Sequence, residues 1–158
     1  MKVKFLLSSV VIILAIVPIL GQEPVWYANL MTLKPLETSR NQVEAVFAQS
    51  RLKDSYSSNG ILTVFYTDND GKFTAKYSLD DKVIIDGTSY AASPGRLISL
   101  IYFPRVKLAK SRFNFGKLLR PTTDGHDPAT HYISEQLGIE IGVQRARVDY
   151  IYRFPSKN

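Results

Sequence analysis

Four side chains that could do chemistry lie close together in one polar stretch: Asp124, His126, Asp127 and His131. Imidazole and carboxylate groups are common zinc ligands, and the same groups perform general acid–base catalysis. Their spacing matches no defined motif, and Pro128 prevents a helix from aligning the two histidines. The sequence therefore favours a polar surface loop. A secreted enzyme or a metal-binding protein that uses these residues is the alternative.

Residues 105–120 form a second candidate site, because they contain six cations and no acid. A basic stretch of this kind can contact an anionic surface such as phospholipid, lipopolysaccharide or an acidic glycan. A solvated strand face followed by a loop would produce the same pattern. If the segment contacts an anionic membrane surface, the contact is weak, and the residues expected to make it are Arg105, Lys107, Lys110 and Arg112.

Asp68-Asn69-Asp70-Gly71 has the composition of a calcium loop. A twelve-residue calcium loop would place Tyr66 and Tyr77 at its first and last ligand positions, where carboxylates are needed. The four residues therefore predict a hairpin turn. No serine lies in a Gly-x-Ser-x-Gly motif. We predict no catalytic residue, no cofactor and no bound metal.

The N-terminus has the features of a secretory signal. Lys2 and Lys4 precede an almost entirely apolar run, residues 5–20, which is followed by Gly21. Cleavage after Gly21 would leave residues 22–158 as a single domain in the periplasm or outside the cell. An uncleaved membrane anchor is the alternative. The chain has no cysteine, which excludes disulfides and a lipidated cysteine.

The overall charge argues against nucleic acid as a partner. The formal net charge is +6, which includes Lys2 and Lys4, and this is too small to indicate nucleic acid binding by a secreted chain. We expect an unknown protein or a component of the cell envelope as partner. The oligomeric state stays open.

One helix is predicted from its start signals. Ser39 can cap it, and Gln42 lies three residues later, as a capping box requires. Val43, Val46 and Phe47 then form one apolar stripe. The helix is expected to end near residue 49 or 50, and residues 22–27 are expected to be an extended lead-in.

Strands are predicted over the rest of the chain. Period-two alternation or apolar runs indicate strands at residues 61–67, 73–77, 82–85 and 97–103 and in a closing hairpin over residues 139–154. Residues 86–95 are expected to be a loop. No internal repeat is evident. The predicted fold class is α+β, with one principal N-terminal helix packed on a mainly antiparallel sheet.

Several segments together resemble a known group of proteins. They are Trp26, residues 33–44 (Leu-Lys-Pro-Leu-Glu-Thr-Ser-Arg-Asn-Gln-Val-Glu), residues 103–105 (Phe-Pro-Arg), residues 126–128 (His-Asp-Pro) and residues 147–152 (Arg-Val-Asp-Tyr-Ile-Tyr) with Pro155-Ser156. This pattern is similar to a group of small, uncharacterised secreted bacterial proteins. The chain departs from the group where its helix closes, at residues 47–50, and at the last hairpin turn, residues 144–146.

The segment 38–44 followed by a sheet also resembles, at the level of fold, the small lipoprotein domain of the outer-membrane barrel-assembly machine and β-lactamase-inhibitor domains. That resemblance implies a binding or scaffolding role. The leading hypothesis is therefore a secreted or periplasmic, non-enzymatic binding protein.

Overall fold

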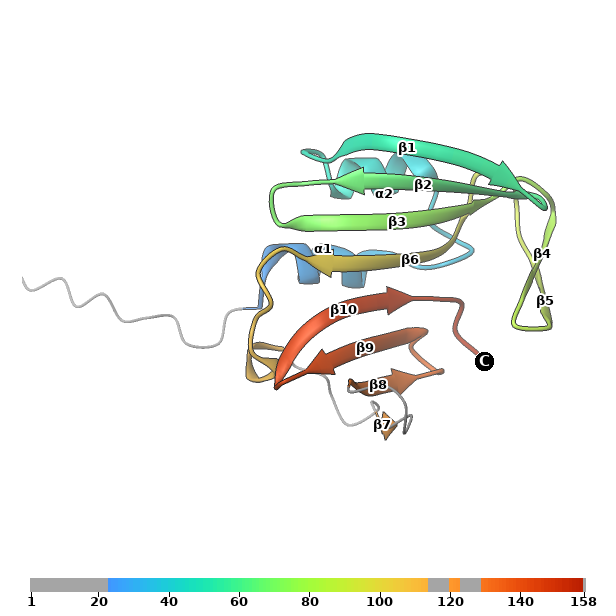
Figure 1. Ribbon diagram of the computed structural model, residues 1–158. Coiled ribbons are helices and arrows are strands. Elements are labelled where there is room, and N and C mark those ends of the chain that lie inside the picture. Colours follow the sequence, from blue (N-terminus) through green and yellow to red (C-terminus); the bar gives the residue numbers. More distant parts are fainter. Residues whose placement is uncertain (1–22, 114–119, 123–128, 158) are drawn as a thin grey trace, which may run out of the picture.

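The computed structural model describes residues 23–113, 120–122 and 129–157, and about half of these lie in antiparallel strands (Figure 1). Eight strands form one sheet in the order β1-β2-β3-β6-β10-β9-β8-β7. Their bounds are β1 Arg51–Ser58, β2 Ile61–Thr67, β3 Gly71–Ser78, β6 Leu97–Pro104, β7 Arg120–Thr122, β8 Thr130–Ser134, β9 Ile139–Gln144 and β10 Arg147–Arg153. Strands β4 Lys82–Ile85 and β5 Thr88–Ala91 pair separately. We call this hairpin the arm.

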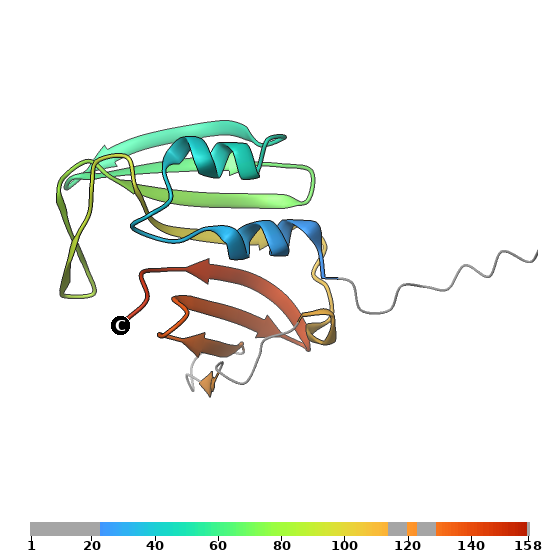
Figure 2. The ribbon, with the colours of Figure 1, turned by 180° about the vertical axis from the view of Figure 1, so that it is seen from behind.

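Two short helices lie on the same face of the sheet, as Figure 2 shows from behind. They are α1 Val25–Thr32 and α2 Arg40–Val46, and a 3-10 turn, η1, covers Lys110–Arg112. The predicted capping box of α2 is confirmed. The Ser39 hydroxyl accepts a hydrogen bond from the Gln42 main-chain N–H, and the Gln42 side chain accepts one from the Ser39 N–H.

The sheet has internal pseudo-twofold symmetry. Strands β1-β2-β3-β6 form one antiparallel four-stranded unit, β7-β8-β9-β10 form a second, and β6 pairs with β10 at the centre. Ile101 faces Tyr152 on the axis, and the flanking pairs are Tyr102 with Ile151 and Leu100 with Arg153. A twofold rotation about the central pair exchanges the two flanking pairs.

The same symmetry appears in the sequence of the two central strands. Residues 96–104 read Arg-Leu-Ile-Ser-Leu-Ile-Tyr-Phe-Pro, and residues 147–155 read Arg-Val-Asp-Tyr-Ile-Tyr-Arg-Phe-Pro. Each strand also carries a bulge at the equivalent position, at Ile98 against β3 and at Asp149 against β9. The chain therefore contains a weak internal repeat, which the sequence analysis missed because only a few positions in it are identical.

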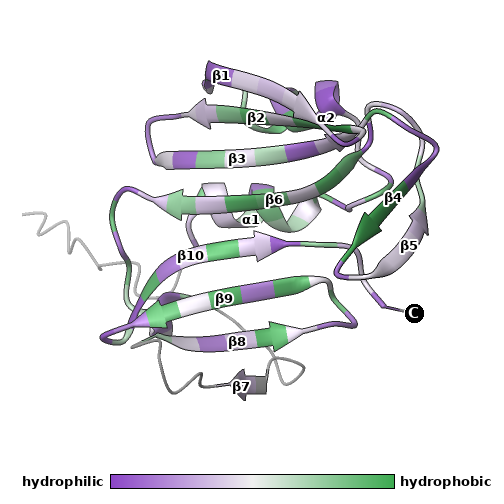
Figure 3. Cartoon of the chain, turned by 45° about the vertical axis from the view of Figure 1, so that its right-hand side comes forward, coloured by the Kyte–Doolittle hydropathy of each residue, from purple (hydrophilic) through white to green (hydrophobic). Residues whose placement is uncertain are grey.

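The core lies between the sheet and the two helices. Trp26 of α1 stacks on Tyr102 with ring centroids 4.8 Å apart, and Phe47, which caps α2, lies 4.6 Å from Phe73. We call this side the covered face. The hydropathy colours of Figure 3 alternate along β3 and β9, as expected for strands with one buried face.

The prediction of an α+β fold with one principal N-terminal helix is wrong. The described residues are 51% strand and 15% helix, and both helices are short. Helix α2 has seven residues and ends at Val46, where the sequence analysis placed its end near residue 50. Two turns of helix bury too little surface to organise a domain, so the eight-stranded sheet supplies most of the core.

Other differences have local causes. Helix α1 begins at Val25, within residues 22–27 that were expected to be extended, and Pro24 at its start leaves no side-chain cap to indicate it. Strand β1 is exposed along its whole length, so it has no buried face to produce alternation. Strand β5 forms within the predicted loop by pairing with β4. The strands predicted at residues 61–67, 82–85 and 97–103 are confirmed.

The described part of the chain contains no helix that is long and apolar enough to span a membrane. The expected signal segment, residues 1–21, lies outside the described residues.

Candidate functional site

The face of the sheet opposite the helices is a candidate binding surface. Figures 1 and 2 together show no described helix on it. We call it the uncovered face. Cross-strand pairing places thirteen central positions on it: Lys72, Thr74 and Lys76 of β3, Ser99, Ile101 and Phe103 of β6, Tyr150 and Tyr152 of β10 with Phe154 beyond it, Glu140 and Gly142 of β9, and His131 and Ile133 of β8. Most of its aromatic and aliphatic side chains are half-buried.

The bulge at Asp149 decides which side chains of β10 reach this face. Val148 and Ile151 lie on the covered face, although they are three positions apart. An extra residue in a strand shifts the alternation by one position. As a result Tyr150 and Tyr152 point to the uncovered face, and Arg153 is buried on the covered face.

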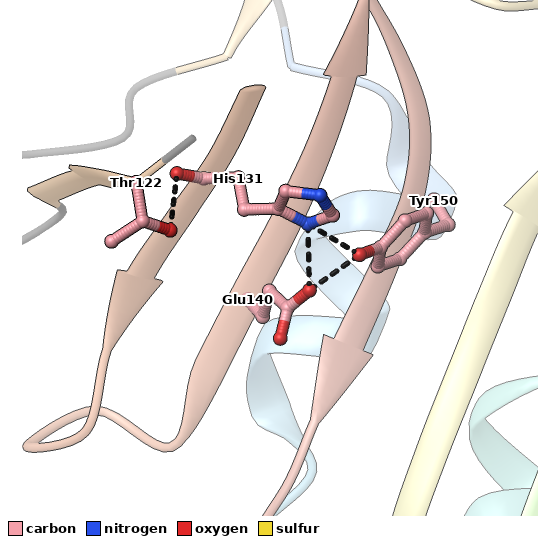
Figure 4. A network of polar contacts seen from close by, with 4 residues as sticks. All are labelled: Thr122, His131, Glu140 and Tyr150. Atoms are coloured by element: carbon pink, nitrogen blue, oxygen red, sulfur yellow. Dashed lines mark hydrogen bonds and ion pairs between the residues drawn. The ribbon is translucent and has the colours of Figure 1, made fainter. Parts of the chain in front are cut away.

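A polar network connects three strands on the uncovered face (Figure 4). The Nδ1 atom of His131 lies 3.0 Å from Glu140 Oε1 and 2.8 Å from the Tyr150 hydroxyl oxygen. The Tyr150 hydroxyl also donates a hydrogen bond to Glu140. A histidine oriented by a carboxylate occurs in hydrolytic sites. Here the same ring nitrogen also contacts the tyrosine hydroxyl, so the three groups hold one another in place.

Gly142 makes this network possible. It pairs with Tyr150 on one side and with His131 on the other. A Cβ atom at Gly142 would lie 2.2 Å from Tyr150 Cε1, so the tyrosine ring crosses directly over the glycine backbone toward the histidine. The absence of a side chain at this position lets the hydroxyl reach Glu140.

A basic pocket of about 470 Å³ opens at the end of the uncovered face where β6 finishes. Its lining residues are Thr67, Gly71, Lys72, Phe103, Pro104, Arg105, Lys107 and Asp149. The ammonium group of Lys72 lies 5.7 Å from the centroid of the Phe103 ring, and Lys107 forms an ion pair with Asp149. We call this the basic pocket. Its volume lies in the range of small-molecule sites.

The basic segment predicted from the sequence is divided between the two faces. Arg105 and Lys107 line the basic pocket. Lys110 instead lies over the ring of Tyr132, 4.1 Å from its centroid, and Tyr132 packs against the core on the covered side. Arg112 is exposed in η1. The four expected contacts therefore do not share one surface.

A second pocket, of about 190 Å³, lies between the arm and the other half of the uncovered face. The arm contributes Ile85, Asp86, Thr88 and Tyr90, and the main sheet and C-terminal segment contribute Ile133, Glu135, Glu140, Tyr152, Phe154, Pro155 and Lys157. We call this the arm pocket. Burial raises the pKa of Tyr152, and the carboxylates of Asp86 and Glu140 raise it further, while a hydrogen bond with Ser99 opposes them.

The two pockets occupy equivalent positions in the two halves. Phe103 and Pro104 line the basic pocket, and Phe154 and Pro155, which are their equivalents in the second half, line the arm pocket. Their charges differ, however. Cations predominate in the first, whereas Asp86, Glu135 and Glu140 line the second, with Lys157 bonded to Glu135. The pseudo-twofold axis thus relates two pockets of opposite charge on one face.

Of the predicted polar loop, only His131 lies in the part of the chain that the structure describes. His131 belongs to β8 and to the network with Glu140 and Tyr150, whereas Asp124, His126 and Asp127 lie outside the described residues. Within residues 23–113, 120–122 and 129–157, no three His, Asp or Glu side chains gather as a metal site.

Several residues of this surface were not predicted from the sequence. Lys72 and Phe103 come from different strands, and only their direct pairing brings them together. Glu140 and Tyr150 were assigned only to strands. The repeated Phe-Pro pair was the one signal in the sequence that marks both pockets.

No protein-family model matches this chain, and neither a curated protein nor a solved structure shows a significant match to it.

Proposed function

We propose that this chain is a non-enzymatic binding protein that works outside the cytoplasm and takes its ligand on the uncovered face. The observation that carries the proposal is the pair of pockets at opposite ends of this face, each walled by a Phe-Pro pair. Concave sites with aromatic walls and a few charged groups are typical of ligand recognition.

The side chains between the pockets support the same function. Phe103 and Tyr150 lie 6.2 Å apart between ring centroids, and Tyr152 and Phe154 lie 5.5 Å apart. These rings are only half-buried, so a ligand on this face would remove further apolar surface from water. Contiguous apolar patches with polar rims usually mark interaction sites.

The location outside the cytoplasm rests on the sequence alone. A basic start, an apolar run over residues 5–20 and Gly21 are the features of a cleaved secretory signal. Resemblance to small secreted bacterial proteins supports the same location.

The binding function is tested by amide chemical-shift mapping with a panel of small anionic, cationic and neutral aromatic compounds. We expect at least one compound to shift amides of β6, β9 and β10 next to the uncovered-face side chains. The amides of α1 and α2 serve as the internal control. Binding confined to the helices, or no binding by any compound, would contradict the proposal.

A further inference from the structure

The charges of the basic pocket set the charge of a suitable ligand. Three cations, Lys72, Arg105 and Lys107, line it together with one carboxylate, Asp149. Because Lys107 and Asp149 pair with each other, an excess of two positive charges remains. A phosphate monoester carries a charge of about −1.5 to −2 at neutral pH and therefore matches this excess.

Among the described residues, the head groups of Lys72 and Arg105 make no close ion pair. The main-chain N–H of Arg105 is fixed by a hydrogen bond to the Asp70 carbonyl, whereas its guanidinium makes a long contact, 3.4 Å, with the Asp68 carbonyl. Lys72 extends across the Phe103 ring. A guanidinium fork and an ammonium group are the side chains that most often bind phosphate oxygens.

The wall of the pocket indicates what carries the phosphate. Phe103 and Pro104 provide an apolar wall next to the cations, and Phe103 is only half-buried. A flat apolar group lying on this wall would be covered on one side by the phenylalanine ring, which favours aromatic or other flat bodies.

We propose that the basic pocket binds an organic phosphate monoester through Lys72 and Arg105, with its apolar body against Phe103. This assignment rests on the proposed function, because it names the ligand class of one of the two pockets. The phosphate can come from a soluble compound or from a lipid headgroup, and the chemistry of recognition is the same.

The full-length chain is expressed, and the exported protein is purified for the test. Phenyl phosphate is the probe, and its binding is measured by titration calorimetry and amide chemical-shift mapping. We expect one-to-one binding that weakens with salt and shifts the amides of Lys72, Phe103 and Arg105. Inorganic phosphate and phenol, which each retain half of the probe, should bind at least about tenfold more weakly.

Matched variants locate the binding. Lys72→Gln should weaken phenyl phosphate binding about tenfold or more, whereas Lys76→Gln, on the same strand and face but outside the pocket, should leave it unchanged. Phe103→Leu should weaken binding, whereas the symmetry-related Phe154→Leu should not. Equal effects within either pair would overturn the proposal, because they would show a general charge or stability effect.

Removal of the carboxylate that lines the basic pocket should strengthen phenyl phosphate binding, which is the opposite of the effect expected for Lys72→Gln. Asp149→Asn releases Lys107 from its ion pair and should tighten phenyl phosphate binding several-fold. Asp86→Asn changes the net charge by the same amount in the arm pocket and serves as the control. Unchanged or weaker binding by Asp149→Asn would count against the assignment.

Vesicles distinguish the two phosphate sources. Co-sedimentation with vesicles carrying a phosphate-monoester lipid, phosphatidic acid, that is lost in Lys72→Gln and kept in Lys76→Gln assigns the site to a headgroup. Phenyl phosphate binding without vesicle binding assigns it to a soluble ligand. If other compounds shift the uncovered face but neither phosphate probe binds the basic pocket, the inference fails and the proposed function stands. If no compound shifts this face, both fail.

Discussion

Arg153 Nη2 donates a 2.9 Å hydrogen bond to the main-chain oxygen of Leu33, and this contact joins the last strand of the sheet to the end of the first helix. Both residues are buried. The oxygen lies at the C-terminal end of α1, where the helix dipole favours a positive charge. Arg153 Nη1 donates a second bond to the Leu137 carbonyl. Burial lowers the pKa of Arg153, and nearby Tyr27 opposes that effect.

Replacement of this arginine should cost substantial stability. Arg153→Met removes both hydrogen bonds and leaves the Leu33 and Leu137 oxygens without their donor, so we expect the free energy of unfolding to fall by about 2–3 kcal/mol. Urea denaturation measures it. Arg147→Met is the control, because the Arg147 side chain is exposed and its contact with the Lys107 oxygen is long, at 3.5 Å. Equal losses in the two variants would show that the buried contact is not stabilising.

A substitution in the turn between β9 and β10 should increase the stability of the protein. Arg145 and Ala146 both have positive φ, at 50° and 60°, in a two-residue hairpin of the kind that favours Asn-Gly. Ala146→Gly should raise the free energy of unfolding by about 0.5–1 kcal/mol, because glycine adopts this conformation without strain. Thermal unfolding detects the gain.

The arm supplies the reverse control for this prediction. Gly87 has φ 78°, and a Cβ atom there would meet nothing within 4 Å, so Gly87→Ala tests conformation alone. It should lower stability by about 1 kcal/mol. A loss in Ala146→Gly would mean that the left-handed turn is not the stable conformation.

Gly142→Ala should disrupt the polar network on the uncovered face. The added methyl group would overlap the Tyr150 ring and force it away from His131 and Glu140. Overpacking of this kind costs about 1–3 kcal/mol. In a Tyr150→Ala background the same change should cost much less, and a double-mutant cycle measures the difference. Additive losses would show that the ring does not lie over the glycine.

Stability should fall at alkaline pH. Burial raises the pKa of Tyr27 to about 12, with a contribution from Glu23, and burial also raises the pKa values of Tyr77 and Tyr102. An unfolded tyrosine ionises near pH 10, so the native state retains protons that the unfolded state releases. The contribution of these tyrosines to stability is fully present below about pH 10 and is lost as the pH rises toward their pKa values in the folded protein.

Urea midpoints measured between about pH 9 and pH 12 test this dependence. Tyr27→Phe, which removes one ionising group at nearly constant volume, should flatten the decline. A midpoint that does not change up to about pH 12 would contradict the raised pKa values.

N-terminal processing gives a separate prediction from the sequence. Protein exported by the cell should begin near Gln22, because the apolar run ends at Leu20 and Gly21 follows. N-terminal sequencing or intact mass measures the start. A mass that still includes residues 1–21 would indicate a membrane anchor.

Local patterns in the sequence predicted the elements that have a clear buried face or a specific start signal. The alternation over residues 73–77 identified β3, and Ser39 with Gln42 located the start of α2. Strand β1 escaped prediction because its side chains are exposed throughout and its main chain is ordered by pairing with β2. Pairing energy of this kind leaves no trace in hydrophobic periodicity.

By itself the sequence indicated many strands, the β2–β3 and β9–β10 hairpins and the basic character of residues 105–112. Only the tertiary structure decided how the strands join and which face each side chain occupies. The bulge at Asp149 illustrates the reason: one extra residue moves Tyr150 and Tyr152 to the uncovered face and Arg153 into the core. Likewise, Lys72 and Arg105 line the same pocket only because β3 pairs with β6. The arm separates these two strands in the chain. Such juxtapositions depend on long-range pairing and register, which local residue patterns do not specify.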